Sequence, residues 1–246
     1  MKLFYHIGRY FLLMSHVFSK PDKYRVFYKQ TIREIESLGI DSIGIVTIIS
    51  VFMGAIITIQ TAYNTDNPLY PSYLIGLTVR DTLLLEFSST IIALILAGKI
   101  GSNIASEIGT MRITEQIDAL EIMGVNSANY LILPKIIAAI FFLPFLTIIS
   151  IFIGLFGGWI AGVSTGVVST QDYIYGIQYA FTPYYIIYGL IKVSVFAFII
   201  TSISSYYGYY SHGGSLEVGK SSTLAVVNSS IFILVFNLIL TQLLLS

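Results

Sequence analysis

The sequence predicts an all-α integral membrane protein with five transmembrane helices, and two observations carry this prediction. Hydrophobic residues make up 55% of the 246 residues and charged residues only 11%, whereas a globular domain carries roughly 25% charged residues. A spanning helix needs about 20 mostly apolar residues. Five stretches are long enough, namely 43–63, 82–104, 132–163, 184–206 and 223–245. This composition excludes a soluble monomer.

Charge and cysteine content exclude several further classes. The chain has 13 Lys and Arg against 13 Asp and Glu, so there is no basic surplus for binding nucleic acid. It has no cysteine, which excludes disulfide frameworks, thiolate zinc sites and cysteine nucleophiles. No set of catalytic residues and no metal site is predicted.

Residues 1–40 precede the first span and mix aromatic residues with seven Lys and Arg. That composition is typical of helices that lie in the headgroup region, and Pro21 and Asp22 are expected to divide the segment in two. The alternative is a basic juxtamembrane segment that only sets topology. No Ala-x-Ala cleavage site follows, so the segment is expected to be retained. We therefore divide the chain into interfacial helices over 1–40 and a membrane domain over 41–246.

The distribution of cations predicts the orientation, because Lys and Arg near span ends stay in the cytoplasm. With the N-terminus inside, the loops 64–73 and 164–183 lie outside and contain no Lys or Arg. Five spans then place the C-terminus outside. The largest continuous cytoplasmic piece is the loop between spans two and three.

That loop contains a predicted amphipathic helix over about 107–124. Thr114 is expected to cap its N-terminus and Gly124 to end it. Its apolar face is formed by Ile113, Ile117, Leu120, Ile122 and Met123, and its acidic face by Glu107, Glu115, Asp118 and Glu121. Such a helix either docks a soluble partner or is an ordinary interfacial loop helix.

Small residues recur every four positions in spans two and three. The two stripes are Ala93, Ala97, Gly101, Ala105 and Gly109, and Gly154, Gly158, Gly162 and Gly166. Small-xxx-small faces let helix backbones approach closely in lipid. The stripes are expected to pack spans of one chain together or to contribute to a homodimer seam.

Two motifs near the end of the chain suggest enzymes. Residues 214–221 match the P-loop pattern G-x-x-x-x-G-K-[ST]. A P-loop must follow a buried strand, whereas here a tyrosine-rich span precedes the motif, so a glycine-rich turn is expected. His212-Gly213-Gly214-Ser215 is similar to an oxyanion loop, but no activated serine set accompanies it.

Two charged residues lie well inside the predicted spans, Glu86 in the second and Lys192 in the fourth. Ionisable residues there are candidates for function because isolated charge in the bilayer costs several kcal/mol. Their expected depths differ by roughly 6 Å at 1.5 Å rise per residue, which allows them to pair. The pair is either a structural lock between spans or part of a transport path.

The cytoplasmic loop also carries the motifs of a known family. The sequence resembles the MlaE/YrbE permeases of MCE-type ATP-binding-cassette lipid transporters, over most of residues 45–245. The resemblance is carried by Glu107-Ile108-Gly109-Thr110-Met111, Thr114-Glu115-Gln116, Asp118-Ala119-Leu120, Met123-Gly124-Val125 and Pro134-Lys135. Two departures concern the lipid path. The family commonly has Arg-Glu-Leu-Gly-Pro where this chain has residues 85–89, and Arg where it has Lys99 and Lys135.

The resemblance implies a permease subunit and not an enzyme. Such permeases are homodimers that bind a cytoplasmic ATPase dimer and a periplasmic MCE-domain protein, and they move phospholipid between the bacterial inner membrane and that periplasmic assembly. ATP and Mg would be bound by the ATPase. A membrane enzyme or scaffold without a transport path is the alternative.

Roles for individual residues are expected from the resemblance, from the small-residue spacing and from the charges inside the spans. Those expected to couple the ATPase are Glu107, Gly109, Thr110, Met111, Thr114, Glu115, Gln116, Ala119 and Leu120. Those expected on the lipid path are Glu86, Gln60 and Lys192, with Lys192 as the phosphate contact. Those expected to pack helices are Ala97, Gly101, Ala105, Gly154, Gly158 and Gly162.

Overall fold

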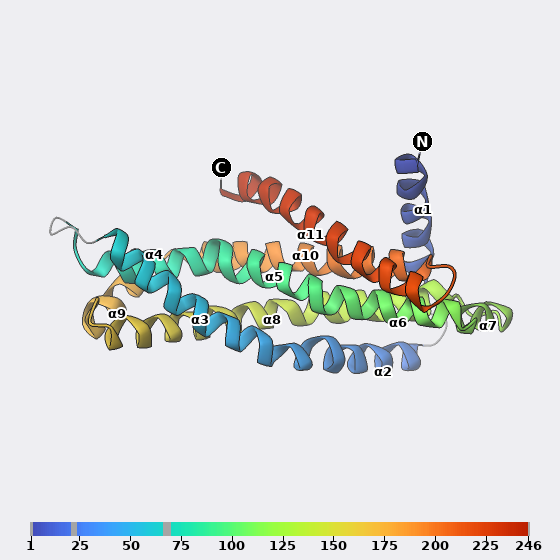
Figure 1. Ribbon diagram of the computed structural model, residues 1–246, viewed down its shortest axis with the longest axis horizontal. Helices are drawn as coiled ribbons and strands as arrows, with labels where there is room; N and C mark the ends of the chain where they lie inside the picture. Colours follow the sequence, from blue (N-terminus) through green and yellow to red (C-terminus); the bar gives the residue numbers. More distant parts are fainter. Residues whose placement is uncertain (1, 21–23, 66–69, 246) are drawn as a thin grey trace. The chain divides into compact units, whose positions relative to one another are not determined.

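A computed structural model describes residues 2–20, 24–65 and 70–245, and every regular element within these ranges is helical (Figure 1). Five continuous helices are long and apolar enough to cross a membrane. They cover Tyr24–Asn64, Tyr73–Ile113, Ser127–Ser164, Tyr184–Tyr209 and Ser215–Leu245. Each contains most or all of one predicted span, so the predicted fold class is confirmed.

The first two long helices change geometry along their length. The first consists of α2 (Tyr24–Glu34), the π-helical η1 (Ile35–Ile40) and α3 (Asp41–Asn64). The second consists of α4 (Tyr73–Thr82), η2 (Leu83–Ile91), α5 (Ile92–Leu96), η3 (Ala97–Gly101) and α6 (Ser102–Ile113). Wide π-helical turns are rare and often occur at functional sites. They were not predicted from the sequence.

The remaining elements include three single long helices and three short ones. The long helices are α8 (Ser127–Ser164), α10 (Tyr184–Tyr209) and α11 (Ser215–Leu245). The short ones are α1 (Lys2–Val17), α7 (Gln116–Ile122) and α9 (Thr170–Gln178).

The N-terminal segment contains two helical pieces, as expected, but the second does not end before the first span. Only α1 is a separate helix, because residues 24–40 continue into α3 without interruption. The break expected at Pro21 and Asp22 lies outside the described residues. Figure 1 shows α1 running across the direction of α2 and α6.

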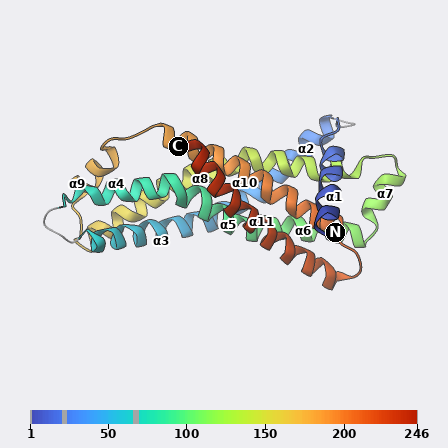
Figure 2. The same ribbon diagram turned by 90° about the horizontal axis from the view of Figure 1, so that it is seen from above.

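The chain forms two compact units. Unit 1 contains residues 1–41, 93–143 and 194–246, and unit 2 contains residues 42–92 and 144–193. In unit 1, α11 packs along α6, and Ser222 Oγ on α11 donates to the carbonyl of Ser102 at 3.2 Å. In unit 2, α4 and α9 lie side by side, as the two views in Figures 1 and 2 show.

The predicted small-residue stripes face other helices of the same chain. Ala97 and Ala105 are fully buried, and Gly101 faces Ser204 of α10. In unit 2, the backbone of Gly154 lies so close to Gly54 that a Cβ on Gly54 would overlap the Gly154 carbonyl. Gly158 faces Thr58 and Tyr173, and Gly162 faces Val168. Packing within one chain, one of the two expected uses, is therefore what these contacts provide.

Candidate functional site

The helix predicted over 107–124 is divided between two helices. Residues 107–113 complete α6, and α7 begins at Gln116. The prediction that Thr114 caps the loop helix is wrong, because Thr114 ends α6 and its hydroxyl donates to the Thr110 carbonyl at 2.8 Å. Glu115 then takes a left-handed conformation, with φ at +60°, which turns the chain into α7. We call residues 107–124 the coupling segment.

The predicted end of the coupling segment is confirmed. Gly124 has φ of +78° and donates its N–H to the Glu121 carbonyl at 2.9 Å, while Val125 N–H reaches the Leu120 carbonyl at 3.0 Å. This pair of hydrogen bonds is the Schellman motif, which favours glycine because its φ is positive.

The apolar residues of α7 do not share one face. Ile117 is fully buried and Leu120 is half-buried, whereas Ile122 is 87% exposed and Met123 68% exposed. Two neighbouring large apolar side chains are thus exposed at the C-terminal end of a short loop helix. Exposed apolar groups of this kind mark interaction surfaces when they are contiguous.

The turn between α6 and α7 is braced by an ion pair. Arg112 Nη1 lies 2.7 Å from Asp118 Oδ1. Among the other predicted coupling residues, Thr110, Glu115, Gln116 and Ala119 are exposed, Met111 is half-buried and Gly109 packs against Val218.

Glu107 has a different environment from the free acidic face that was expected. Its Oε2 lies 2.7 Å from Nζ of Lys135, whose side chain is only 2% exposed, and Glu34 Oε1 lies 2.7 Å from the same nitrogen. The three residues come from α6, α8 and α2, so one buried cation joins three helices. Two carboxylates neutralise a cation that would be costly to bury alone.

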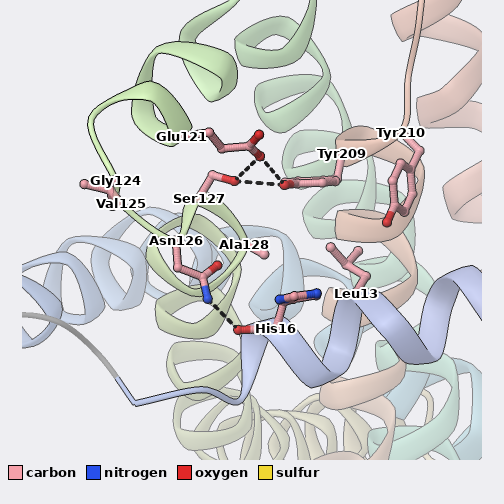
Figure 3. Close-up of a pocket in the computed structure, with 10 residues that line it drawn as sticks. All are labelled: Leu13, His16, Glu121, Gly124, Val125, Asn126, Ser127, Ala128, Tyr209 and Tyr210. Atoms are coloured by element: carbon pink, nitrogen blue, oxygen red, sulfur yellow. Dashed lines mark hydrogen bonds between the residues drawn. The ribbon is translucent and has the colours of Figure 1, made fainter.

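A second polar cluster links the coupling segment to α10. Glu121 Oε1 accepts hydrogen bonds from Ser127 Oγ at 2.9 Å and from Tyr209 Oη at 3.0 Å, and the two hydroxyls are 2.8 Å apart (Figure 3). The cluster borders a pocket of about 580 Å³ whose opposite wall includes Leu13 and His16 of α1. The pocket therefore separates α1 from the Glu121 cluster.

Unit 2 contains the predicted charge pair. Lys192 Nζ lies 3.0 Å from Glu86 Oε1, so the expectation that the two residues pair is confirmed. The same nitrogen donates to the Leu85 carbonyl at 3.1 Å and to Tyr188 Oη at 3.0 Å. Glu86 and Leu85 lie in η2, so the π-helical segment supplies two of these acceptors.

The two partners differ in exposure, which bears on their expected roles. The Lys192 side chain is fully buried, whereas that of Glu86 is 45% exposed and also accepts from Thr90 Oγ1 at 3.0 Å. Lys192 Nζ donates to three protein acceptors. Because Glu86 is the more exposed residue, it is the member of the pair that faces outward. Gln60, also predicted on the lipid path, is exposed on α3.

Several polar residues escaped the sequence analysis. The hydroxyls of Ser50, Ser150 and Ser88 form a buried chain with spacings of 2.9 and 3.1 Å. Asn126 and Asn129 hydrogen-bond to the end of α1. Serine and asparagine occur throughout the chain, so only the fold identifies these particular ones.

The enzyme-like motifs near residue 214 have no enzyme-like surroundings. Gly213, with φ of +103°, lies in the turn after α10, and α11 begins at Ser215. No strand precedes the motif in the described part of the chain. The expected glycine-rich turn ends at Gly214, and residues 215–221 of the motif are helical instead. A P-loop requires a strand before it.

Comparisons with known proteins agree with this architecture. The family model for permease MlaE matches residues 31–243. A probable ABC transporter permease protein of Rickettsia bellii is 35% identical over 243 residues, covering 99% of this chain and 93% of the relative. The intermembrane phospholipid transport system permease protein MlaE of Haemophilus influenzae is 30% identical over 232 residues, covering 94% and 88%. The Arabidopsis thaliana protein TRIGALACTOSYLDIACYLGLYCEROL 1, chloroplastic, is 32% identical over 220 residues, covering 89% and 63%. The chain therefore belongs to the MlaE permease family.

Proposed function

We propose that this protein is the transmembrane permease subunit of an ATP-binding-cassette transporter that moves glycerophospholipids. Membership of the MlaE family supports the transport role, and the name of the Haemophilus influenzae relative supports the phospholipid substrate. The subunit acts as a homodimer in the bacterial inner membrane, with an ATPase dimer in the cytoplasm and an MCE-domain protein in the periplasm. It exchanges lipid with that MCE assembly and so contributes to outer-membrane lipid homeostasis.

The cation distribution supports the proposed orientation. The N-terminus lies in the cytoplasm and the C-terminus in the periplasm, because the loops expected outside contain no Lys or Arg. In this orientation the coupling segment faces the cytoplasm, where an ATPase that binds ATP and Mg can reach it.

The observation that carries the proposal is the exposure of Ile122 and Met123 on α7. Two neighbouring apolar side chains form an anchor that a groove on a soluble partner can bury. Aromatic and aliphatic anchors at the centre of an interface supply most of its binding energy. Ile117 is buried and fixes the other side of α7. A displacement of α7 by the ATPase would therefore also displace the residues of the membrane domain that contact Ile117.

The experiment that tests the ATPase contact is co-purification of the ATPase with variants of this chain. The double change Ile122→Asp with Met123→Asp should abolish ATPase binding while the permease remains in the membrane. Leu216→Asp is the matched control, because Leu216 is 82% exposed in unit 1 but lies on α11. ATPase binding that survives the double change would refute the contact.

We infer that Glu86 and Gln60 line the lipid path, whereas Lys192, expected there as the phosphate contact, is fully buried and positions Glu86. The exposed part of the Glu86 side chain can contact the amine of a head group, and Lys192 holds the carboxylate in place. Lipid mass spectrometry of the purified protein should show less bound phospholipid in Glu86→Gln. Lipid content equal to that of the unsubstituted protein would remove Glu86 from the path.

A further inference from the structure

The C-terminal end of α1 is bound by side chains from the start of α8. The last carbonyls of a helix have no partner within the helix and need one elsewhere. Asn126 Nδ2 donates to the His16 carbonyl at 3.1 Å, and Asn129 Nδ2 donates to the Val17 carbonyl at 2.7 Å. Figure 3 shows the first of these hydrogen bonds.

Two more hydrogen bonds extend this contact beyond the helix end. Asn126 Nδ2 also donates to Ser19 Oγ at 2.9 Å, and Asn129 Nδ2 to the Ser19 carbonyl at 2.7 Å. The two asparagine amides thus hold residues 16–19, and Asn129 is 5% exposed. This contact is local, polar and directional.

Asn126 stabilises two helices at once. Its Oδ1 accepts the N–H of Asn129 at 3.2 Å, which caps the N-terminus of α8, while its Nδ2 serves the end of α1. An asparagine amide both accepts and donates, whereas an aspartate at the same position only accepts. The two functions of Asn126 can therefore be separated by a change of one atom.

The body of α1 is bound to a different helix, α10. His6 Nδ1 and Tyr206 Oη are 2.7 Å apart, and Tyr10 Oη donates to Ser202 Oγ at 2.9 Å. The Arg9 guanidinium lies 3.7 Å from the centre of the Tyr210 ring, which is close for a cation–π contact. Burial raises the pKa of Tyr10, so its phenol remains a neutral donor at physiological pH.

We propose that Asn126 and Asn129 are positioning residues that fix α1 to the start of α8, directly after the coupling segment. Asn126 follows Gly124 by two residues, so a displacement of α7 acts on the two asparagines. The two asparagines transmit the displacement to α1. Contacts of α1 with Tyr206 and Tyr210 then transmit it to the end of α10. This inference rests on the proposed function, because it assumes that an ATPase moves α7.

The variants follow from the chemistry of the two amides. Asn126→Asp and Asn129→Asp remove the donors to α1, and the carboxylate introduced by Asn126→Asp would still cap α8. Each lost hydrogen bond should weaken the docking of α1 by roughly fivefold. Ser19→Ala removes one acceptor without touching α8, and Asn103→Asp, at an exposed position of α6, is the control for the added charge.

The first measurement uses the permease alone. The chain has no cysteine, so Leu12→Cys, at a position 63% exposed on α1, accepts a single nitroxide label. Its spectrum should show faster motion in the Asn126→Asp/Asn129→Asp double variant, a smaller increase in Ser19→Ala, and no change in Asn103→Asp. A label that moves as slowly in the double variant as in the unsubstituted protein would overturn the proposal.

The second measurement uses the complex with its ATPase in lipid nanodiscs, with ATP hydrolysis and phospholipid transfer recorded separately. The double variant should bind the ATPase and hydrolyse ATP, but transfer several-fold less lipid for each ATP. If the double variant has a more mobile label but still transfers as much lipid for each ATP, α1 does not transmit the motion of α7 to α10. If the unsubstituted permease binds no ATPase, the proposed function fails, while the label spectrum still decides whether the asparagines hold α1.

Discussion

Lys135 in unit 1 and Lys192 in unit 2 are both buried, yet their charges are neutralised in different ways. Lys135 lies 2.7 Å from each of two carboxylates, those of Glu34 and Glu107. Within the described part of the chain, Lys192 pairs with one carboxylate, that of Glu86 at 3.0 Å, and donates to two neutral acceptors. A cation with two carboxylates tolerates the loss of one, whereas a cation with one carboxylate does not.

In both clusters a buried cation pairs with a carboxylate that is partly exposed. The Glu34 side chain is 17% exposed and that of Glu107 is 46% exposed, so the Lys135 cluster is closed on the Glu34 side and open at Glu107. Glu86 leaves nearly half of its side chain exposed, although its partner is fully buried. We expect both clusters to act in stability, and the Lys192 pair to act also in ligand contact because Glu86 is the carboxylate proposed to lie on the lipid path.

The largest effect is expected for Lys135→Met. The change leaves two carboxylates without their shared cation, and breaking a buried ion pair on one side costs about 3–5 kcal/mol. Thermal unfolding in detergent should show a large loss of stability. Lys220→Met is the control, because Lys220 is 68% exposed and its pairing with Glu217 should contribute within about 1 kcal/mol.

A rescue experiment checks the cause of that loss. Adding Glu34→Gln and Glu107→Gln to Lys135→Met removes the unpaired carboxylates, so part of the stability should return. A triple variant less stable than Lys135→Met would mean that the loss comes from packing around the lysine stem.

The second effect concerns Glu86→Gln, which leaves the Lys192 ammonium with neutral acceptors. A hydrogen bond to a charged group contributes about 1.5–3 kcal/mol, and this is the loss expected. Adding Lys192→Met removes the stranded cation, so the double variant should be more stable than Glu86→Gln alone. Thermal stability of the single and double variants tests this order, and two single variants as stable as the unsubstituted protein would contradict it.

The third effect, that of removing one carboxylate from the Lys135 cluster, is smaller because the second carboxylate remains paired with Lys135. Glu34→Gln or Glu107→Gln alone should cost about 1.5 kcal/mol, the low end for a charged hydrogen bond. The two changes together should cost more than the sum of the single changes, because only the double variant leaves Lys135 without a carboxylate. Additive losses in unfolding experiments would show that the two carboxylates act independently.

The spans and the Glu86 pairing could be predicted from sequence because each depends on composition. Apolar runs identify spans, and two charges inside them have few possible partners. The Lys135 cluster could not be predicted, since Glu34 belongs to the segment 1–40, which was expected to lie in the headgroup region. The cap at Thr114 was misplaced because its hydroxyl also satisfies the Thr110 carbonyl, an alternative that the sequence does not exclude. The asparagines at α1 were missed because hydrogen bonds between distant segments leave no periodic signal.

The smallest effect is expected for Tyr188→Phe, which removes a neutral acceptor of Lys192. The ring stays in place, and Lys192 keeps Glu86 Oε1 and the Leu85 carbonyl. The net loss should be about 1 kcal/mol, as for a typical neutral hydrogen bond. Tyr185→Phe, at a half-buried position on the same helix, is the control and should change stability less. Bound phospholipid should be unchanged in Tyr188→Phe and reduced in Glu86→Gln, because only the second change alters the exposed carboxylate. If Tyr188→Phe destabilises the protein as much as Glu86→Gln, the neutral acceptors and not the carboxylate determine how Lys192 is held.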